Sequence, residues 1–146
     1  MNDDSPIIIV NLKAYEQGYG ANGFDLCKIM EEIALEHKVN LAAAVSPIDL
    51  VDFSDNLDIP IFAQHVDGVN FGSHTGSILP EAVRYSGAVG TLVNHAECQM
   101  SWEEIEKTIN RCKELDLLTV LCTADISSSE KGSHPVSYTH LTLPTR

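Results

Sequence analysis

The feature that most constrains this sequence is a regular alternation of short apolar runs with longer segments of helical periodicity. Runs rich in β-branched or small apolar residues begin near positions 7, 41, 59, 88 and 117. The first run, 6–12, is apolar without alternation, which is typical of a strand buried on both faces. Recurrence at intervals of about 20–35 residues predicts repeated strand–helix units and a parallel sheet.

The segments between the apolar runs carry signals for the starts and ends of helices. Pro47 and Pro80 stand where short helices would open, because proline is favoured in a first helical turn. Gly87 is placed to end the second of these helices. Ser101, followed three residues later by Glu104, has the pattern of a capping box and predicts another helix start.

Two architectures fit five parallel strands. One is an open, doubly wound sheet, and the other is an incomplete (β/α)8 barrel of about four βα units plus a fifth strand. A nucleotide-binding doubly wound sheet favours a G-x-G-x-x-G turn after its first strand, and the segment 11–20 lacks this turn. A barrel instead places functional residues at the carboxyl ends of several strands.

Polar side chains follow three of the apolar runs at the point where each run ends. They are Asn11 and Lys13, Gln64 and His65, and Asn94, His95 and Glu97. Because parallel strands end on one rim of a sheet, we expect these side chains to converge. Together they supply a cation, a polar hydrogen and several hydrogen-bond donors, which suits an anionic carbonyl substrate.

Each of these residues also has a purely structural interpretation. Lys13 can be a solvated loop lysine, and His95 can be a core histidine bonded to a carbonyl. Asn11 and Gln64 can satisfy backbone groups. Glu97 can favour the start of a helical turn through its charge. The barrel interpretation is preferred because it accounts for all of them at once.

Composition excludes several classes of partner. The 146 residues include 9 Lys and Arg against 21 Asp and Glu, a net charge of −12, which argues against nucleic acid and anionic membranes as partners. No run approaches the roughly 18 apolar residues of a membrane span, and the amino terminus has no signal-peptide pattern, so we expect a cytoplasmic protein. The four cysteines form no C-x-x-C pair and are expected to be reduced and mostly buried. His65, His74 and His95 lack close ligand spacing, so we expect no metal site.

Four motifs follow one another with the expected strand context. They are NLK at 11–13, AQH at 63–65, GSHTGSILPEAV at 72–83 and GAVGTLVNHAE at 87–97. Over about residues 6–123 the sequence resembles the triosephosphate isomerases, and the archaeal branch in particular. The resemblance implies a TIM barrel, with residues 1–123 as its amino-terminal part. It also implies interconversion of dihydroxyacetone phosphate and glyceraldehyde 3-phosphate through an enediolate, without metal or organic cofactor.

The resemblance also implies roles for the residues at the strand ends. Lys13 would bind the substrate and stabilise its developing negative charge, with Asn11 beside it as a substrate-binding residue. His95 would be the electrophile that polarises the carbonyl. In the family, a short helical turn keeps this imidazole neutral. Residues 96–99 could form that turn here.

Four further residues take supporting roles under the same resemblance. Glu97 would hold Lys13 or a loop of a neighbouring subunit, and Gln64 and Asn94 would support the site. Thr75 lies in a segment that resembles the family's subunit-contact loop. The full-length parent is therefore expected to be a homo-oligomer, a dimer or a tetramer.

The family's catalytic glutamate has no counterpart in this sequence. A complete barrel needs about 250 residues. In the family this glutamate follows the sixth strand, and the phosphate is held by backbone amides after strands six to eight. Glu130 follows no such strand. We therefore expect the 146-residue chain to be inactive and marginally folded, with its first and fifth strands as unpaired edges.

The last residues do not resemble the rest of the sequence. Residues 136–145 can be written back as GTC TCT TAT ACA CAT CTG ACG CTG CCG ACG, which resembles read-through into a transposase adaptor of sequencing libraries. We expect 124–135 to be a polar segment and 136–146 to be a non-native tail. The alternative is a genuine Thr-rich strand and tail.

Two other functions remain open from the sequence. One is another phosphosugar-binding barrel enzyme. The other is a non-catalytic half-barrel that works by self-association, in which two copies would bury each other's sheet edges.

Overall fold

The computed structural model describes residues 6–123 and the backbone of a strand at 138–142. The strands are β1 (Ile7–Asn11), β2 (Asn40–Val45), β3 (Ile61–Ala63), β4 (Gly90–Val93), β5 (Leu118–Thr123) and β6 (Tyr138–Thr142). The helices are the short 3-10 helix η1 (Glu16–Gly18), α1 (Gly20–His37), α2 (Leu50–Asn56), α3 (Pro80–Tyr85) and α4 (Trp102–Glu114). The five predicted strands are therefore present, each within about two residues of its expected start.

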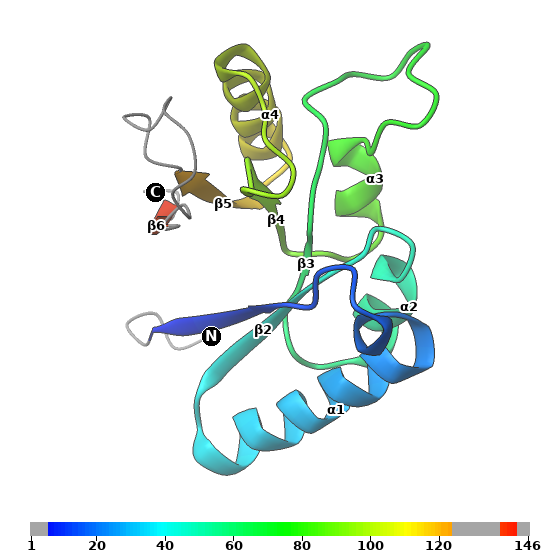
Figure 1. Ribbon diagram of the computed structural model, residues 1–146, viewed down its shortest axis with the longest axis vertical. Coiled ribbons are helices and arrows are strands. Elements are labelled where there is room, and N and C mark those ends of the chain that lie inside the picture. Colours follow the sequence, from blue (N-terminus) through cyan, green and yellow to red (C-terminus); the bar gives the residue numbers. More distant parts are fainter. Residues whose placement is uncertain (1–5, 124–137, 143–146) are drawn as a thin grey trace.

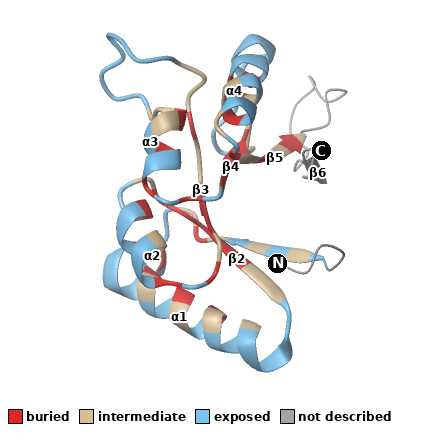
Figure 2. Cartoon of the chain, turned by 180° about the vertical axis from the view of Figure 1, so that it is seen from behind, coloured by how far each residue is buried: buried red, intermediate tan, exposed pale blue. Residues whose placement is uncertain are grey.

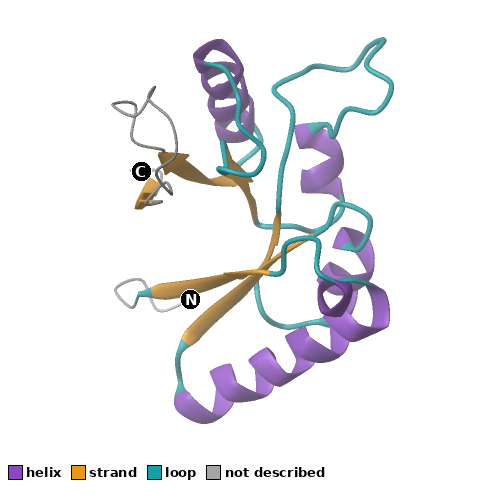
Figure 3. Cartoon of the chain, viewed as in Figure 1, coloured by secondary structure: helices purple, strands orange, loops and turns teal. Residues whose placement is uncertain are grey.

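The first five strands form one parallel sheet whose spatial order follows the sequence, β1-β2-β3-β4-β5. A doubly wound sheet would instead reverse its strand order partway across. The strands curve past one another, and the helices lie outside this curve (Figures 1 and 3). This arrangement corresponds to the expected incomplete (β/α)8 barrel.

The two faces of the sheet are packed differently, and β2 shows the division. Ala43 and Val45 belong to a buried cluster that includes Cys27, Met30 and Phe53 from the helices. Ala42 and Ala44, the alternate residues, belong to a second cluster made only of strand residues, among them Phe62, Leu92 and Val120. Figure 2 shows the buried residues along the strands and the exposed ones on the outer sides of the helices. The second cluster is thus the inner wall of the partial barrel.

Helix starts follow the predicted signals in two cases and differ in one. Pro80 is the first residue of α3, and Ser101 caps α4 in a capping box with Glu104. The prediction that Pro47 opens a helix was wrong. Residues 47–49 form a turn in which the Asp49 amide bonds the Ser46 carbonyl, and α2 begins only at Leu50.

The outer strands differ from the two unpaired edges that were expected. β1 pairs only with β2 among the described strands, so it is an edge. β5 is not an edge, because β6 pairs with it antiparallel, with Val120 opposite Leu141. A returning strand after β5 satisfies the backbone groups that an edge would leave open. β6 lies within the predicted non-native tail, whose origin stays a prediction.

Among the described helices, none is both long enough and apolar enough to cross a bilayer.

Candidate active site

Lys13 stands at the carboxyl end of β1 in a left-handed backbone conformation, with φ of 55°. Two hydrogen bonds hold its backbone there. Its amide donates to Asn11 Oδ1 at 2.9 Å, and its carbonyl accepts from Gln64 Nε2 at 2.9 Å. Gln64 Nε2 also reaches the Ala44 carbonyl at 3.2 Å. The ends of β1, β2 and β3 are therefore tied together around a lysine whose conformation is costly for a residue with a Cβ.

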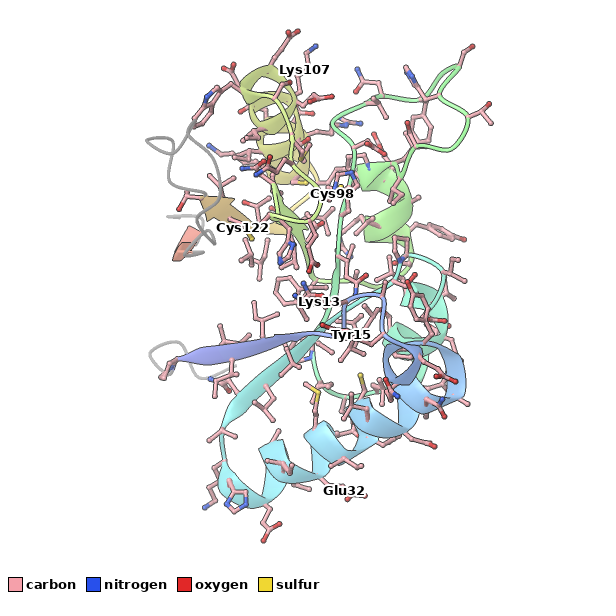
Figure 4. The ribbon with its side chains drawn as sticks, in the orientation of Figure 1. Lys13, Tyr15, Glu32, Cys98, Lys107 and Cys122 are labelled. Carbon is pink, nitrogen blue, oxygen red and sulfur yellow. The ribbon has the colours of Figure 1, made fainter. Side chains whose placement is uncertain are left out.

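The Lys13 side chain extends from the end of β1 toward the loop after β4 (Figure 4). Its Nζ lies 2.9 Å from Glu97 Oε1. The hydrogen bond and charge of Glu97 raise the pKa of Lys13, and the hydrogen bond from Lys13 is the main cause of a lowered pKa at Glu97. Both side chains remain charged at neutral pH, and both are partly exposed to solvent. The cation is therefore kept on the rim and fixed in direction.

His95 is the second residue after β4 and lies beside the same carboxylate. Its Nδ1 accepts a hydrogen bond from the Glu97 backbone amide at 3.1 Å and is 3.6 Å from Glu97 Oε2. An amide can only donate, so the shorter contact assigns the acceptor role to Nδ1 and leaves the proton of the neutral ring on Nε2. That ring presents an N–H to any group beyond Nε2.

The segment after His95 is a turn rather than the helical turn expected over 96–99. The Cys98 amide donates to the His95 carbonyl at 2.8 Å, and the next helix after His95 begins at Trp102. A backbone N–H, that of Glu97, still points at Nδ1. Only the element that supplies the amide differs from the expectation.

Asn94 connects this turn to the neighbouring strand. It has a φ of 57°, a left-handed conformation that asparagine tolerates better than most residues. Its Nδ2 donates to the Cys122 carbonyl of β5 at 3.0 Å, and its Oδ1 accepts from the Met100 amide at 2.9 Å. Asn94 therefore fixes where the chain turns away from β4 and so where His95 points.

The predicted site residues thus fall into two groups. Six of them lie together on one rim of the sheet, linked by the contacts above: Asn11, Lys13, Gln64, Asn94, His95 and Glu97. Thr75 does not lie among them. It belongs to the exposed segment 70–77 of the loop between β3 and α3, which projects from the body of the molecule in Figure 1.

The sequence analysis did not recognise that His65, Asp67 and Cys98 form a cluster. His65 lies between Asp67 and Cys98, with its two ring nitrogens 3.3 Å from Asp67 Oδ1 and 3.6 Å from Cys98 Sγ. The i, i+2 spacing of His65 and Asp67 at a strand end was visible in the sequence. The approach of Cys98, from a different loop, had no local signal.

The expectation that the cysteines are reduced and mostly buried agrees with the structure. All four are free thiols, and three are buried, but Cys98 is exposed. Among the residues that the structure describes, no three His, Cys, Asp or Glu side chains are grouped to hold a metal ion.

Comparison with known proteins gives a consistent result. A family model described as Triosephosphate isomerase matches residues 6–141. The triosephosphate isomerase of Methanothermobacter thermautotrophicus is 44% identical over 126 residues, covering 86% of this chain and 55% of the relative. That of Methanocaldococcus jannaschii is 41% identical over 124 residues, covering 85% and 57%. The chain spans about half the length of the curated relatives it matches.

A solved structure supports the fold. The crystal structure of triosephosphate isomerase from Bartonella henselae superposes with a TM-score of 0.69 at 15% sequence identity. The superposition covers 81% of this chain and 51% of that chain. At this identity the likeness concerns the fold alone, which is a partial (β/α)8 barrel.

Proposed function

The chain belongs to the triosephosphate isomerase family, and from that premise we propose that it supplies the amino-terminal catalytic residues of an enzyme that interconverts dihydroxyacetone phosphate and glyceraldehyde 3-phosphate. The reaction moves a proton between two adjacent carbons through an enediolate, so its transition state carries negative charge on oxygen. Residues that stabilise an oxyanion at fixed positions are therefore what this half of the enzyme has to provide.

One observation carries the proposal: Lys13 and His95, far apart in the sequence, are both held by Glu97, the lysine through the carboxylate and the imidazole through the backbone amide. A cation and an N–H donor are thereby held on one rim in positions that are set before charge develops on the substrate. Lys13 would bind the substrate and stabilise the negative charge that develops on it, and Asn11 would lie beside Lys13. His95 Nε2–H would polarise the carbonyl, and triosephosphate isomerase is itself the known example of this use of a neutral imidazole.

The proposed chemistry needs no metal or organic cofactor, since a proton shift between adjacent carbons involves no external electrons. It does need a general base. We expect this chain alone to be inactive, because no glutamate of the described residues stands in the context that the family's base occupies. The chain contributes stabilisation of the intermediate, and the base and phosphate loops would come from a carboxyl-terminal half.

A chimera tests the proposal. Residues 1–123 of this chain would be joined to the carboxyl-terminal part of the Methanothermobacter thermautotrophicus relative, and isomerisation of glyceraldehyde 3-phosphate would be followed in a coupled assay. We expect activity, and we expect His95→Gln and Lys13→Met to lower kcat by about 100-fold or more each. His37→Gln, at the exposed end of α1, serves as the matched control and should leave kcat unchanged.

Two outcomes would refute this assignment. A chimera that is folded by circular dichroism but inactive would remove the catalytic role of this half. An active chimera whose kcat is unaffected by His95→Gln would remove His95 from the mechanism. Turnover by the 146-residue chain alone that depends on His95 would contradict its expected inactivity.

The proposal extends to the assembly and the setting of the full enzyme. The exposed loop segment 70–77, with Thr75 near its middle, would contact a second subunit of a homo-oligomer. The enzyme would act in the cytoplasm, in glycolysis and gluconeogenesis, on a small phosphorylated triose. The net charge of −12 supports the expectation that neither nucleic acid nor an anionic membrane is a partner.

A further inference from the structure

Cys98, His65 and Asp67 form a cluster beside the proposed active site but outside its set of residues. Cys98 Sγ lies 3.6 Å from His65 Nδ1, and His65 Nε2 lies 3.3 Å from Asp67 Oδ1. The three side chains come from two loops, one after β3 and one after β4. The order thiol, imidazole, carboxylate is that of an activated nucleophile with its base and the group that orients the base.

Asp67 is held firmly, which fixes the ring of His65. Its Oδ2 accepts from the Ile78 amide at 2.7 Å, and its own amide donates to the Ile78 carbonyl at 2.9 Å. The remaining oxygen, Oδ1, faces His65 Nε2. A carboxylate can only accept, so Nε2 carries the proton and Nδ1 is left as an acceptor facing the thiol.

Cys98 is also the accessible thiol of the described residues. Its position is exposed, and the His65 side chain beneath it is 21% exposed. The other three cysteines are buried, and burial raises the pKa of Cys27 and of Cys112 to about 11 and also raises the pKa of Cys122. These three thiols should therefore react slowly with electrophiles, and they serve as internal references.

We propose that Cys98 is a modification site, a nucleophilic thiol that attacks hydroperoxides and other soft electrophiles selectively because His65, oriented by Asp67, accepts its proton. With hydrogen peroxide, the sulfur forms an S–O bond as the O–O bond breaks. The thiol proton passes by way of His65 Nδ1 to the departing hydroxide, which leaves as water. The sulfur is oxidised by two electrons to a sulfenic acid and the peroxide is reduced. This inference does not depend on the proposed isomerase function.

The first test uses the unmodified chain and iodoacetamide, with peptide mass spectrometry giving a rate for each cysteine at pH 7. Each rate is measured in buffer and in concentrated urea. We expect folding to accelerate alkylation of Cys98 about three- to tenfold and to slow that of Cys27, Cys112 and Cys122. A Cys98 rate that is equal or lower in the folded chain overturns the proposal, and this comparison requires no variant.

Variants then locate the cause of the reactivity. His65→Gln and Asp67→Asn should each lower the Cys98 rate at pH 7 by about three- to tenfold, and His37→Gln, remote from Cys98, should not change it. At pH 10, above the ordinary thiol pKa of about 8.5, the rates of the wild-type and His65→Gln chains should converge. Rates that stay different at pH 10 would mean that His65 acts through access rather than as a base, and would overturn the assignment.

The second test uses hydrogen peroxide with a dione trap for sulfenic acid. The trapped adduct should appear on the peptide that contains Cys98, at a rate that falls about three- to tenfold in His65→Gln. Cys98→Ser should abolish it. An adduct distributed equally over all four cysteines, or one insensitive to His65→Gln, contradicts the proposal.

Discussion

Two residues of the candidate site, Lys13 and Asn94, have left-handed backbones although neither is glycine. Such conformations cost about 1–2 kcal/mol for residues with a Cβ and persist where surrounding hydrogen bonds impose them. At Lys13 these bonds come from Asn11 and Gln64, and at Asn94 they come from its own side chain. Each conformation redirects the chain at a strand end, next to a side chain that lies on the rim: Lys13 itself after β1 and His95 after β4.

Substitution of Asn94 should separate the contribution of its side-chain hydrogen bonds from the cost of its left-handed backbone. Asn94→Ala removes the bonds to Cys122 and Met100 and leaves a Cβ in a left-handed conformation, so we expect a loss of about 2–3 kcal/mol in the free energy of unfolding. Asn94→Gly removes the same bonds without the strain and should lose about 1–2 kcal/mol. Urea unfolding followed by circular dichroism measures both. Equal stability of the two variants would argue against strain at this position.

The charges of Lys13 and Glu97 should be visible in a titration. The carboxyl carbon of Glu97, followed by NMR, should titrate below its ordinary pKa, and Lys13→Met should raise that pKa while Lys113→Met leaves it unchanged. Since the folded pKa of Glu97 is lowered, the stabilisation by the pair is complete above pH 4.5 and is lost as pH falls through the folded value.

At high pH the stabilisation is lost as pH rises rather than as it falls, because the folded pKa of Lys13 is raised. Its part of the stabilisation is complete below pH 10.5 and is lost as pH rises through the folded value. Between these limits the contribution should not vary with pH. Added salt should move the Glu97 pKa back toward its ordinary value, since both side chains are partly exposed. A Glu97 pKa that Lys13→Met does not change would contradict the ion pair.

At the scale of elements, close approach between strands sets the position of β4. Gly90 opens β4 against Leu118 of β5 and the ring of Phe62 from β3. A Cβ added at Gly90 would lie 2.5 Å from both the Leu118 carbonyl oxygen and a ring carbon of Phe62. Phe62 is fully buried on the inner wall, so its ring cannot easily move away. β4 therefore carries Asn94 and His95 to the rim only because its first residue lacks a side chain.

Gly90→Ala should consequently destabilise the fold by overpacking. We expect a loss of about 1–3 kcal/mol in the free energy of unfolding, measured by urea titration. A Gly90→Ala variant as stable as the wild type would mean that the inner wall adapts easily.

For the whole molecule, the open side of the sheet is the main departure from a closed barrel. β1 has one described neighbour, β2, and its outward residues Ile8 and Val10 are 55% and 37% exposed. An exposed apolar edge strand is a template for pairing with another chain. The inner wall is better protected, since Ala42, Ala44 and Phe62 are completely buried despite the missing strands.

The chain should therefore self-associate as its concentration rises. Ile8→Lys adds a charge to the edge strand and should shift the equilibrium toward monomer, as measured by sedimentation velocity. Leu35→Lys, at an 83% exposed position on α1, is the control for general solubility and should have little effect. A monomer at all concentrations, or an equal effect of both lysines, would argue against association through β1.

The sequence by itself determined the elements and their order. A continuous apolar run identified β1, Pro80 and the Ser101–Glu104 pair marked two helix starts, and polar residues after three strands identified the rim. These signals are local, because propensity, capping and periodicity act within a few residues. The turn at Pro47 was misread because proline suits both a turn and a first helical turn.

Only the tertiary structure decided how the side chains on the rim engage one another. The bond from Gln64 to the Lys13 carbonyl, the ion pair of Lys13 with Glu97 and the approach of Cys98 to His65 join residues that are 51, 84 and 33 positions apart. Their sequence carries no pairing signal, since such contacts depend on strand register and on where left-handed residues turn the chain. The same holds for β6, because its antiparallel pairing depends on the open edge of β5 that receives it.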